Sequence, residues 1–182
     1  MVTQTIPTMN RPQTAIRLVT SLCRLLVGHS DKLTASTRTL GGKTILMVTA
    51  AKCDIGRLYG PSGTLLNSLN RLGPELAAAD FETVIEESTV QAQRVEHKRW
   101  DAAAVESAFR EILKVIFNGD CTIEWTDSGT MALVGVTVGR GFDPDMLRMA
   151  ESDLRIVFNA ICRAHNHKIR ISVTEQRKEV RA

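Results

Sequence analysis

The segment Gly60-Pro61-Ser62-Gly63 holds the residues whose types and spacing point most directly to a chemical role. Glycine has no Cβ, so the backbone of another molecule can approach a G-x-x-G turn closely. Where a helix follows the turn, the backbone N–H groups of its first turn favour a phosphate group. These four residues therefore suggest a contact with a nucleic-acid backbone. A bare G-x-x-G is common by chance, so its weight depends on the elements around it.

The surroundings of this segment strengthen the interpretation. Asp54-Ile55-Gly56-Arg57 precedes it, and a segment with leucines at helical spacing follows it. An adjoining groove between helix and strand can hold unpaired bases through apolar contacts and hydrogen bonds to their edges.

Apolar spacing predicts the order α-β-β-α-α-β for the first part of the chain. Thr14 is the expected N-cap of the first helix and Gly28 its stop, and Gly41-Gly42 is a strong hairpin signal. Gly73-Pro74 is expected to end the helix after the G-x-x-G segment. The predicted elements are a helix at 14–27, strands at 32–40 and 43–50, a helical turn at 54–59, a helix at 64–72 and a strand at 80–87.

The second part of the chain repeats the order as α-β-β-α-β, which predicts two similar small domains. Its elements are expected at 105–117, 121–125, 131–138, 144–165 and 168–174. The predicted fold class is α+β, with two tandem units that each pack a three-stranded sheet with helices. The expected division is a flexible N-terminus at 1–13, a first domain at 14–88, a connecting helix or linker at 89–104, a second domain at 105–175 and a tail at 176–182.

In this context the first unit resembles a type II KH domain, and is most similar to the small bacterial single-KH RNA-binding proteins. That motif has an acidic, an aliphatic, a glycine and a basic residue, then two aliphatic residues and GXXG. The matching residues are Asp54, Ile55, Gly56, Arg57, Leu58, Gly60 and Gly63, with Tyr59 in a usually aliphatic place. The resemblance covers 14–87 and implies tandem KH-like units, a bacterial or phage source, and binding of about four nucleotides of single-stranded RNA, less often DNA.

The resemblance also implies which residues would touch the RNA. The expected RNA-binding residues are Gly56, Arg57, Gly60, Pro61, Ser62, Gly63, Lys52 and Lys43. The expected groove residues are Ile45, Met47, Ile55 and Leu66. The family's two variable loop residues usually include Lys or Arg, whereas Pro61 and Ser62 are neutral. Arg57, Lys52 and Lys43 are therefore the candidates for the missing positive charge.

The second unit is expected to be degenerate. Aligning Asp54 with Asp143 places the loop on Met149-Ala150-Glu151-Ser152, where both glycines are lost and an acid is present. We expect this unit to serve dimerisation, protein contacts or support of the first unit. Gly139-Arg140-Gly141 is a weaker candidate contact, and an ordinary flexible turn is the favoured interpretation.

The distribution of charge favours an anionic partner for the first part. The whole chain has a net charge of +3, but the segment up to Gly73 has nine basic and two acidic residues, so it is +7 and the remainder −4. A basic segment in a nearly neutral chain suggests a local polyanion, such as nucleic acid, with a solvated basic surface as the alternative.

Composition excludes several classes of protein. At 43% hydrophobic residues the chain can build a core, and its apolar runs are too short for a membrane span. We expect no secretory signal in 1–12, and the four cysteines form no C-x-x-C pair, which predicts buried thiols in the cytoplasm. Only 4% of the residues are aromatic, which argues against binding by many stacked bases.

The remaining chemistry-bearing residues predict structural roles. Cys162, His165 and His167 lack a complete ligand set, so we expect a helix end with two solvated histidines. Trp100 and Trp125 are expected to pack at the domain junction rather than to stack on bases. No arrangement of a nucleophile and a base is present, so we expect no enzyme, cofactor or metal. The alternatives to RNA binding are a structural or adaptor protein that binds other proteins, and single-stranded DNA binding.

Overall fold

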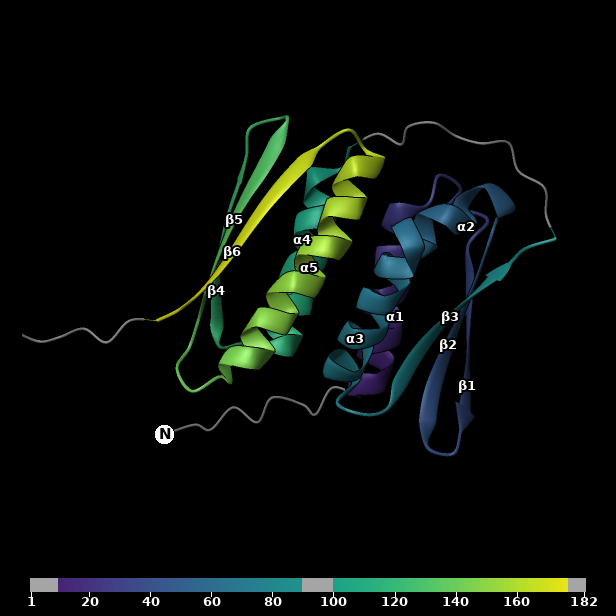
Figure 1. Cartoon of the computed structure of the whole chain (residues 1–182), viewed down its shortest axis with the longest axis horizontal. Coiled ribbons are helices and arrows are strands. Elements are labelled where there is room, and N and C mark those ends of the chain that lie inside the picture. Colours follow the sequence, from purple (N-terminus) through teal and green to yellow (C-terminus); the bar gives the residue numbers. More distant parts are fainter. Residues whose placement is uncertain (1–9, 90–99, 177–182) are drawn as a thin grey trace, which may run out of the picture.

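The computed structural model describes residues 10–89 and 100–176. They form two three-stranded sheets with the helices between them (Figure 1). The elements of the first half are α1 (Arg11–Leu26), β1 (Thr34–Leu40), β2 (Lys43–Ala50), α2 (Lys52–Tyr59), the short 3-10 turn η1 (Pro61–Gly63), α3 (Thr64–Ala77) and β3 (Phe81–Glu87). Those of the second half are α4 (Ala102–Ile116), β4 (Cys121–Asp127), β5 (Met131–Val138), α5 (Pro144–Ala164) and β6 (Lys168–Glu175).

Both sheets are mixed and have the same topology. In the first, β1 pairs with β2 in antiparallel fashion and β2 with β3 in parallel fashion; in the second, β4, β5 and β6 repeat this arrangement. The Gly41-Gly42 hairpin has positive φ at both positions, as a two-residue turn between twisted strands requires. The predicted α+β class with two helix-packed three-stranded sheets is therefore confirmed.

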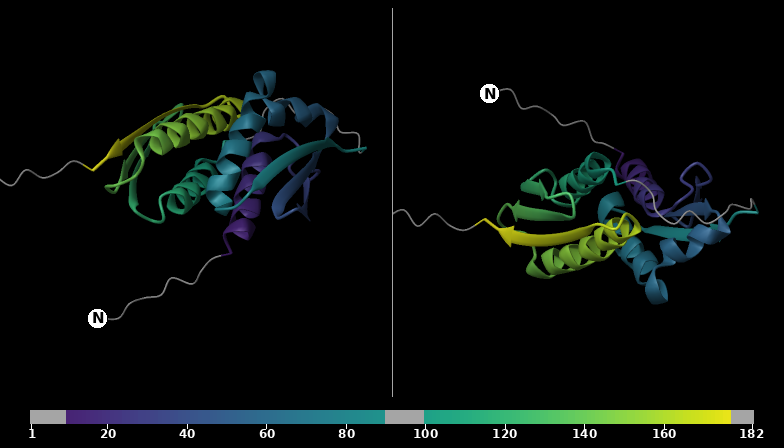
Figure 2. Two further views of the ribbon diagram at one scale, coloured as in Figure 1. Left: turned by 60° about the horizontal axis from the view of Figure 1, so that its bottom comes forward. Right: turned by 90° about the horizontal axis from the view of Figure 1, so that it is seen from above.

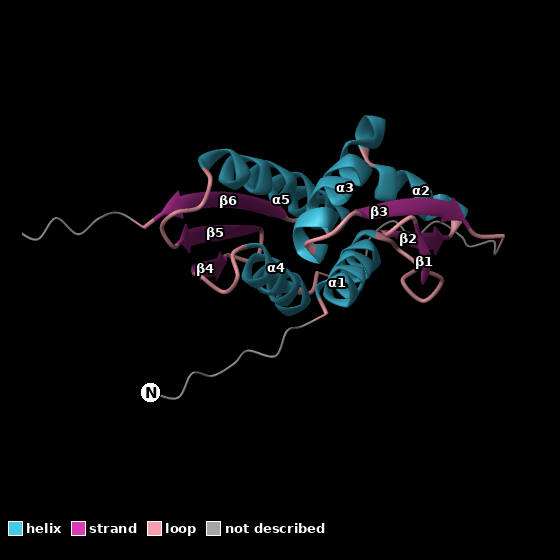
Figure 3. Ribbon diagram, turned by 90° about the horizontal axis from the view of Figure 1, so that it is seen from below, coloured by secondary structure: helices cyan, strands magenta, loops and turns pink. Residues whose placement is uncertain are grey.

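The two halves share one hydrophobic core. α1 and α3 cover one sheet, α4 and α5 cover the other, and the two helix pairs pack against each other in the middle of the molecule (Figure 3). Phe109 of α4 meets Phe158 of α5 edge-to-face, with ring centroids 4.7 Å apart. Because each helix pair buries its outer face against the other, the two units support one another's cores. Among the described residues, no helix is both long and apolar enough to cross a membrane.

α3 and α5 run antiparallel. The Arg71 guanidinium in the middle of α3 bonds the Asp153 carboxylate in the middle of α5, with Nε to Oδ1 3.0 Å apart. Glu75, near the end of α3, shares a small cavity with Met146, near the start of α5. The start of α3 and the end of α5 therefore lie at the same end of the molecule.

α3 does not stop at Gly73-Pro74 as predicted, but continues to Ala77. Gly73 is buried in the helix, and a Cβ at this position would overlap the ring of Phe81 on β3. Glycine is thus needed for close packing of helix and strand, and tertiary packing overrides the local stop signal.

Gly73→Ala is therefore expected to lower the free energy of unfolding by about 1–2 kcal/mol, because the buried Phe81 ring has little room to move. Gly56→Ala is the matched control, since α2 leaves open space around Gly56 and alanine gains about 0.5–1 kcal/mol in a helix interior. Urea denaturation of the two variants checks the opposite signs. Equal effects would contradict the packing role of Gly73.

Two predicted boundaries were wrong. α1 begins at Arg11, so 11–13 are helical rather than flexible, and Thr14 is buried inside the helix rather than capping it. α4 begins at Ala102, where the Asp101 carboxylate accepts a hydrogen bond from the Ala104 N–H at 3.0 Å. The predicted connecting helix lies mostly in 90–99, outside the described residues; Thr89 and Trp100 on either side are not helical.

Candidate nucleic-acid interface

The GPSG turn (residues 60–63) joins α2 to α3 and projects from the body of the molecule (Figure 2). Gly60 ends α2 with φ +69°, and Ser62 and Gly63 follow with φ +51° and +76°. The Gly60 N–H donates to the Gly56 carbonyl at 3.0 Å, and the Gly63 N–H donates to the Gly60 carbonyl at 3.2 Å. Pro61 and Ser62 are exposed, so the two variable positions face solvent.

The two glycines of the GPSG turn differ in their surroundings. A Cβ on Gly60 would lie 2.7 Å from the Leu65 Cβ, whereas a Cβ on Gly63 would meet nothing within 4 Å. Gly63 also precedes the fourteen-residue helix α3, whose first turn has no side-chain cap. Gly60 is thus required by packing, and Gly63 leaves open space beside backbone N–H groups that favour an anion.

Asp54, the acid of the motif, is a structural residue. Its buried carboxylate accepts hydrogen bonds from the Gly28 N–H at 2.9 Å and the His29 N–H at 3.0 Å, and lies 3.1 Å from His29 Nδ1. Burial acts to raise the pKa of Asp54, but these bonds and the Arg57 charge outweigh it and hold the pKa below its ordinary value. Asp54 therefore ties the loop after α1 to the start of α2.

The predicted cations lie in different places. Arg57 Nη1 is 3.6 Å from Asp54 Oδ1, and the Arg57 side chain is only 22% exposed. Lys52, on the same helix, has an 82% exposed side chain, 3.6 Å from Glu87. Both precede the GPSG turn on α2.

Lys43 is not brought to the GPSG turn. It lies at the hairpin end of β2, where its Nζ is 2.7 Å from Glu82 Oε2. α2 follows the other end of that strand, and a strand rises about 3.3 Å per residue, so Lys43 is more than about 20 Å from Ala50. The structure removes Lys43 from the candidate phosphate contacts.

The predicted groove residues separate into two groups. Ile55 on α2 and Leu66 on α3 are partly buried beside the GPSG turn. Ile45 and Met47 are on the central strand β2, where Leu46 and Val48 face the helices. Because side chains alternate along a strand, Ile45 and Met47 lie on the opposite face of the sheet from the helices.

The strand beside the helices of the turn is instead β3, an edge strand of the sheet, which contacts both α2 and α3. Its sequence alternates, with Phe81, Thr83 and Ile85 buried toward the helices. Sequence reasoning missed this role of β3 because local patterns leave the order of strands in a sheet open. The rule that strands joined by a helical crossover run parallel in one sheet would have indicated it.

Much of the positive charge of the first segment is balanced by acids elsewhere. Arg17 Nη1 lies 2.7 Å from Glu111 Oε2 on α4, and Arg71 pairs with the buried Asp153 on α5. Both pairs join the first half to the second. The +7 of the segment therefore overstates the charge that is available to a partner.

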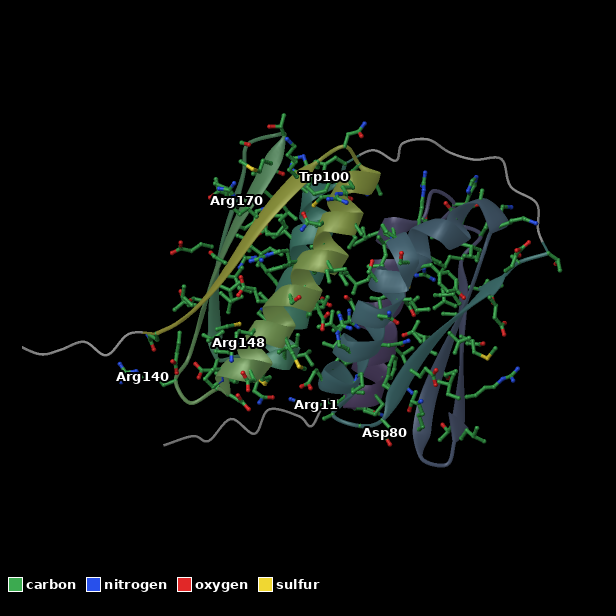
Figure 4. All side chains as sticks on the ribbon, in the orientation of Figure 1. Arg11, Asp80, Trp100, Arg140, Arg148 and Arg170 are labelled. Atoms are coloured by element: carbon green, nitrogen blue, oxygen red, sulfur yellow. The ribbon has the colours of Figure 1, made fainter. Side chains whose placement is uncertain are left out.

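The second half has no counterpart of the GPSG turn among its described residues. α5 is one unbroken helix through Met149 and Ser152, where the alignment placed the loop. The nearby Gly139-Arg140-Gly141 segment is held by the end of β6, since the Gly141 N–H donates to Glu175 Oε1 at 3.2 Å. It forms a tied turn on the surface, with Arg140 extending outward (Figure 4).

The two histidines near the end of α5 are buried, so the prediction that they are solvated was wrong. His167 stacks on Trp100, with centroids 4.0 Å apart, and its Nε2 lies 3.2 Å from Asp127 Oδ1. The Trp100 indole N–H donates to Asp127 Oδ2 at 3.1 Å. Trp100 and Trp125 both pack within the second half, Trp100 on His167 and Trp125 against Phe109 with centroids 5.8 Å apart, rather than at the domain junction as predicted.

One group of described residues could hold a metal. Donor atoms of His29, Cys53 and Asp54 lie within 4.8 Å of one another. A tetrahedral site would need a fourth ligand, and the oxygens of Asp54 already accept hydrogen bonds from the loop backbone. The hydrogen bonds of Asp54 to the backbone and ring of His29 therefore explain why His29, Cys53 and Asp54 lie close together.

The cysteines are all free, but only two of them are buried. Burial raises the pKa of the Cys23 and Cys162 thiols to about 12, with Asp127 adding to the effect at Cys162. Cys53 and Cys121 are partly exposed, contrary to the prediction of four buried side chains.

No protein-family model matches this chain, and no curated protein is similar to it in sequence.

Proposed function

We propose that this protein binds single-stranded RNA without catalysis, through the GPSG turn and the surface that α2, α3 and β3 form beside it. The observation that carries the proposal is the exposed turn itself, with open space at Gly63 next to the uncapped first turn of α3. The Gly63 and Thr64 N–H groups already donate to the Gly60 and Pro61 carbonyls, so a phosphate would be bound by the N–H groups that follow them in the first turn of α3. The motif resemblance to type II KH domains and the parallel pairing of β2 with β3 are consistent with it.

The second half supports the first in this proposal. Its helices α4 and α5 cover the faces of α1 and α3 that an isolated first unit would expose. Dimerisation or protein contacts, the other expected roles, would have to use surfaces outside this packed layer. Four free cysteines suit a reducing compartment, so we place the protein in the cytoplasm.

A second candidate is an adaptor that binds other proteins. The observation that favours it is β1, an edge strand whose seven residues are all exposed. An exposed edge can pair with an extended segment of another protein. Binding of single-stranded DNA would use the same GPSG turn as RNA.

Purification of the tagged protein from cells, with and without nuclease treatment, separates these candidates. RNA binding predicts abundant co-purifying transcripts that nuclease removes. A protein partner that resists nuclease, with no enriched RNA, would overturn the proposal in favour of the adaptor. Competition between RNA and DNA oligonucleotides of matched sequence then decides which nucleic acid is preferred.

A further inference from the structure

A cavity of about 510 Å³ lies between the end of α5 and the start of β6. Arg163 from α5 and Lys168 and Arg170 from β6 line it, together with Asn159 and Asn166. Three cationic side chains and two amides thus surround one hollow. We call it the α5–β6 cavity.

The three cations of this cavity are not balanced by acids. Among residues 10–89 and 100–176, no acidic side chain lies within ion-pair distance of Arg163, Lys168 or Arg170. Arg17 and Arg71, by contrast, pair with acids of the other half. Like charges that share a cavity repel one another, and an anion among them relieves the repulsion.

The backbone around the cavity is firmly held. His167, another lining residue, is only 4% exposed and stacks on Trp100. Its N–H donates to the Cys162 carbonyl at 2.8 Å, which closes the turn from α5 into β6. The neighbouring side chain of Arg170 extends from β6 on the outer side of the sheet (Figure 4). The cations therefore project from a fixed frame.

The carbonyl groups at the C-terminal end of α5 carry a partial negative charge, which would weaken the binding of an anion in the cavity. The last turn of α5 carries about half a negative charge from its carbonyl groups, which Arg163 offsets. Lys168 and Arg170 belong to β6 and remain uncompensated. The residues that line the cavity thus include three cationic side chains and no carboxylate, and the nearest acid with a known contact is Asp127, 3.2 Å from His167.

The α5–β6 cavity and the GPSG turn lie at the same end of the molecule. α3 and α5 are antiparallel and cross at the Arg71–Asp153 pair. With a helical rise of about 1.5 Å per residue, Thr64 lies about 10 Å and Arg163 about 15 Å along the helices from that pair, in the same direction. The turn and the cavity therefore lie at similar heights along the helix layer.

We infer that the α5–β6 cavity binds backbone phosphates of the RNA strand that contacts the GPSG turn. The inference rests on the proposed function and adds the second half to the binding surface. It also locates the positive charge that the neutral Pro61 and Ser62 do not supply. Arginine and lysine would bind the phosphate oxygens through charge-assisted hydrogen bonds.

The test is the salt dependence of RNA affinity for the variant Arg163→Gln/Lys168→Gln/Arg170→Gln. Each lost phosphate contact lowers the log–log slope by about 0.7 for single strands, so the slope should fall by about 2. The control is Arg38→Gln/Lys114→Gln/Arg148→Gln, which removes the same charge at exposed positions outside the cavity and should change the slope by less than about 0.7. Thermal unfolding verifies that both variants fold.

The outcomes separate this inference from the proposed function. If the parent binds RNA, and the cavity variant keeps the same slope as the control, the inference fails and the proposed function stands. If the cavity variant loses slope while acidic substitutions in the GPSG turn change nothing, the cavity binds RNA without the turn, and both the proposed function and the inference in its present form fail. If the parent binds no RNA, both fail.

Discussion

Asp54→Ala is expected to lower the free energy of unfolding by about 2–4 kcal/mol. The substitution leaves the Gly28 and His29 N–H groups without their acceptor and removes a partly buried charge-assisted interaction with the His29 ring. The matched control is Asp31→Ala, because Asp31 is exposed and lies 3.9 Å from Lys32; it should change stability by less than about 0.5 kcal/mol. Urea denaturation measures both.

The effect of Asp54 should depend on pH. Its pKa in the folded protein is below the ordinary value of 3.8, so the native state favours the charged form. The stabilisation is therefore complete above the ordinary pKa and is lost as the pH falls through the lower, folded pKa. The difference in stability between the parent and Asp54→Asn should shrink below about pH 4. A difference that is constant from pH 7 to pH 2 would show that the Asp54 charge contributes nothing.

Pro61→Asp/Ser62→Asp is expected to weaken RNA binding at least about tenfold, or about 1.4 kcal/mol, with the fold retained. The two carboxylates would stand at the start of α3, where a bound phosphate would lie, and would repel it. Aspartate tolerates the left-handed conformation of Ser62, which has φ +51°. Gly60 is unsuited to such a test because any side chain there would collide with Leu65.

The control for this variant is Ala78→Asp/Ala79→Asp, at the opposite end of α3. Both alanines are exposed, and Ala78 has φ +50°, close to that of Ser62. The charge added is the same, so a general electrostatic effect would weaken both variants alike. Fluorescence titration with a short single-stranded RNA compares them, and equal loss in the two would remove the GPSG turn from the binding site.

Local patterns in the sequence predicted most of the elements. Gly41-Gly42 marked a hairpin, and alternation marked the strands, because turn chemistry and side-chain period are local properties. The predicted end of α3 at Gly73-Pro74 was wrong, because Gly73 packs against Phe81 as part of the helix. A local rule cannot anticipate a contact with another element.

The GPSG turn could be predicted from the sequence, but the residues around it in the candidate site could not. The sequence indicated this turn because glycine has no Cβ and readily adopts positive φ, so the residue type alone predicts the backbone conformation. The pairing of Arg71 with Asp153 joins residues far apart in the chain, so the sequence showed the charge and not its partner. Ile45 and Met47 lie on the outer face because they alternate with Leu46 and Val48, which face the helices; all four side chains are apolar, so the sequence left the buried face open.

Ultraviolet crosslinking of single-stranded RNA to the intact protein, with identification of the tryptic peptides that carry nucleotides, tests the central claim most directly. Cleavage after Arg57 and Arg71 isolates 58–71, which contains the whole GPSG turn. We predict that this peptide is the principal crosslinked one in the parent and that the crosslink is lost in Pro61→Asp/Ser62→Asp. Crosslinks confined to other peptides, or no crosslink at all, would contradict RNA binding at the turn.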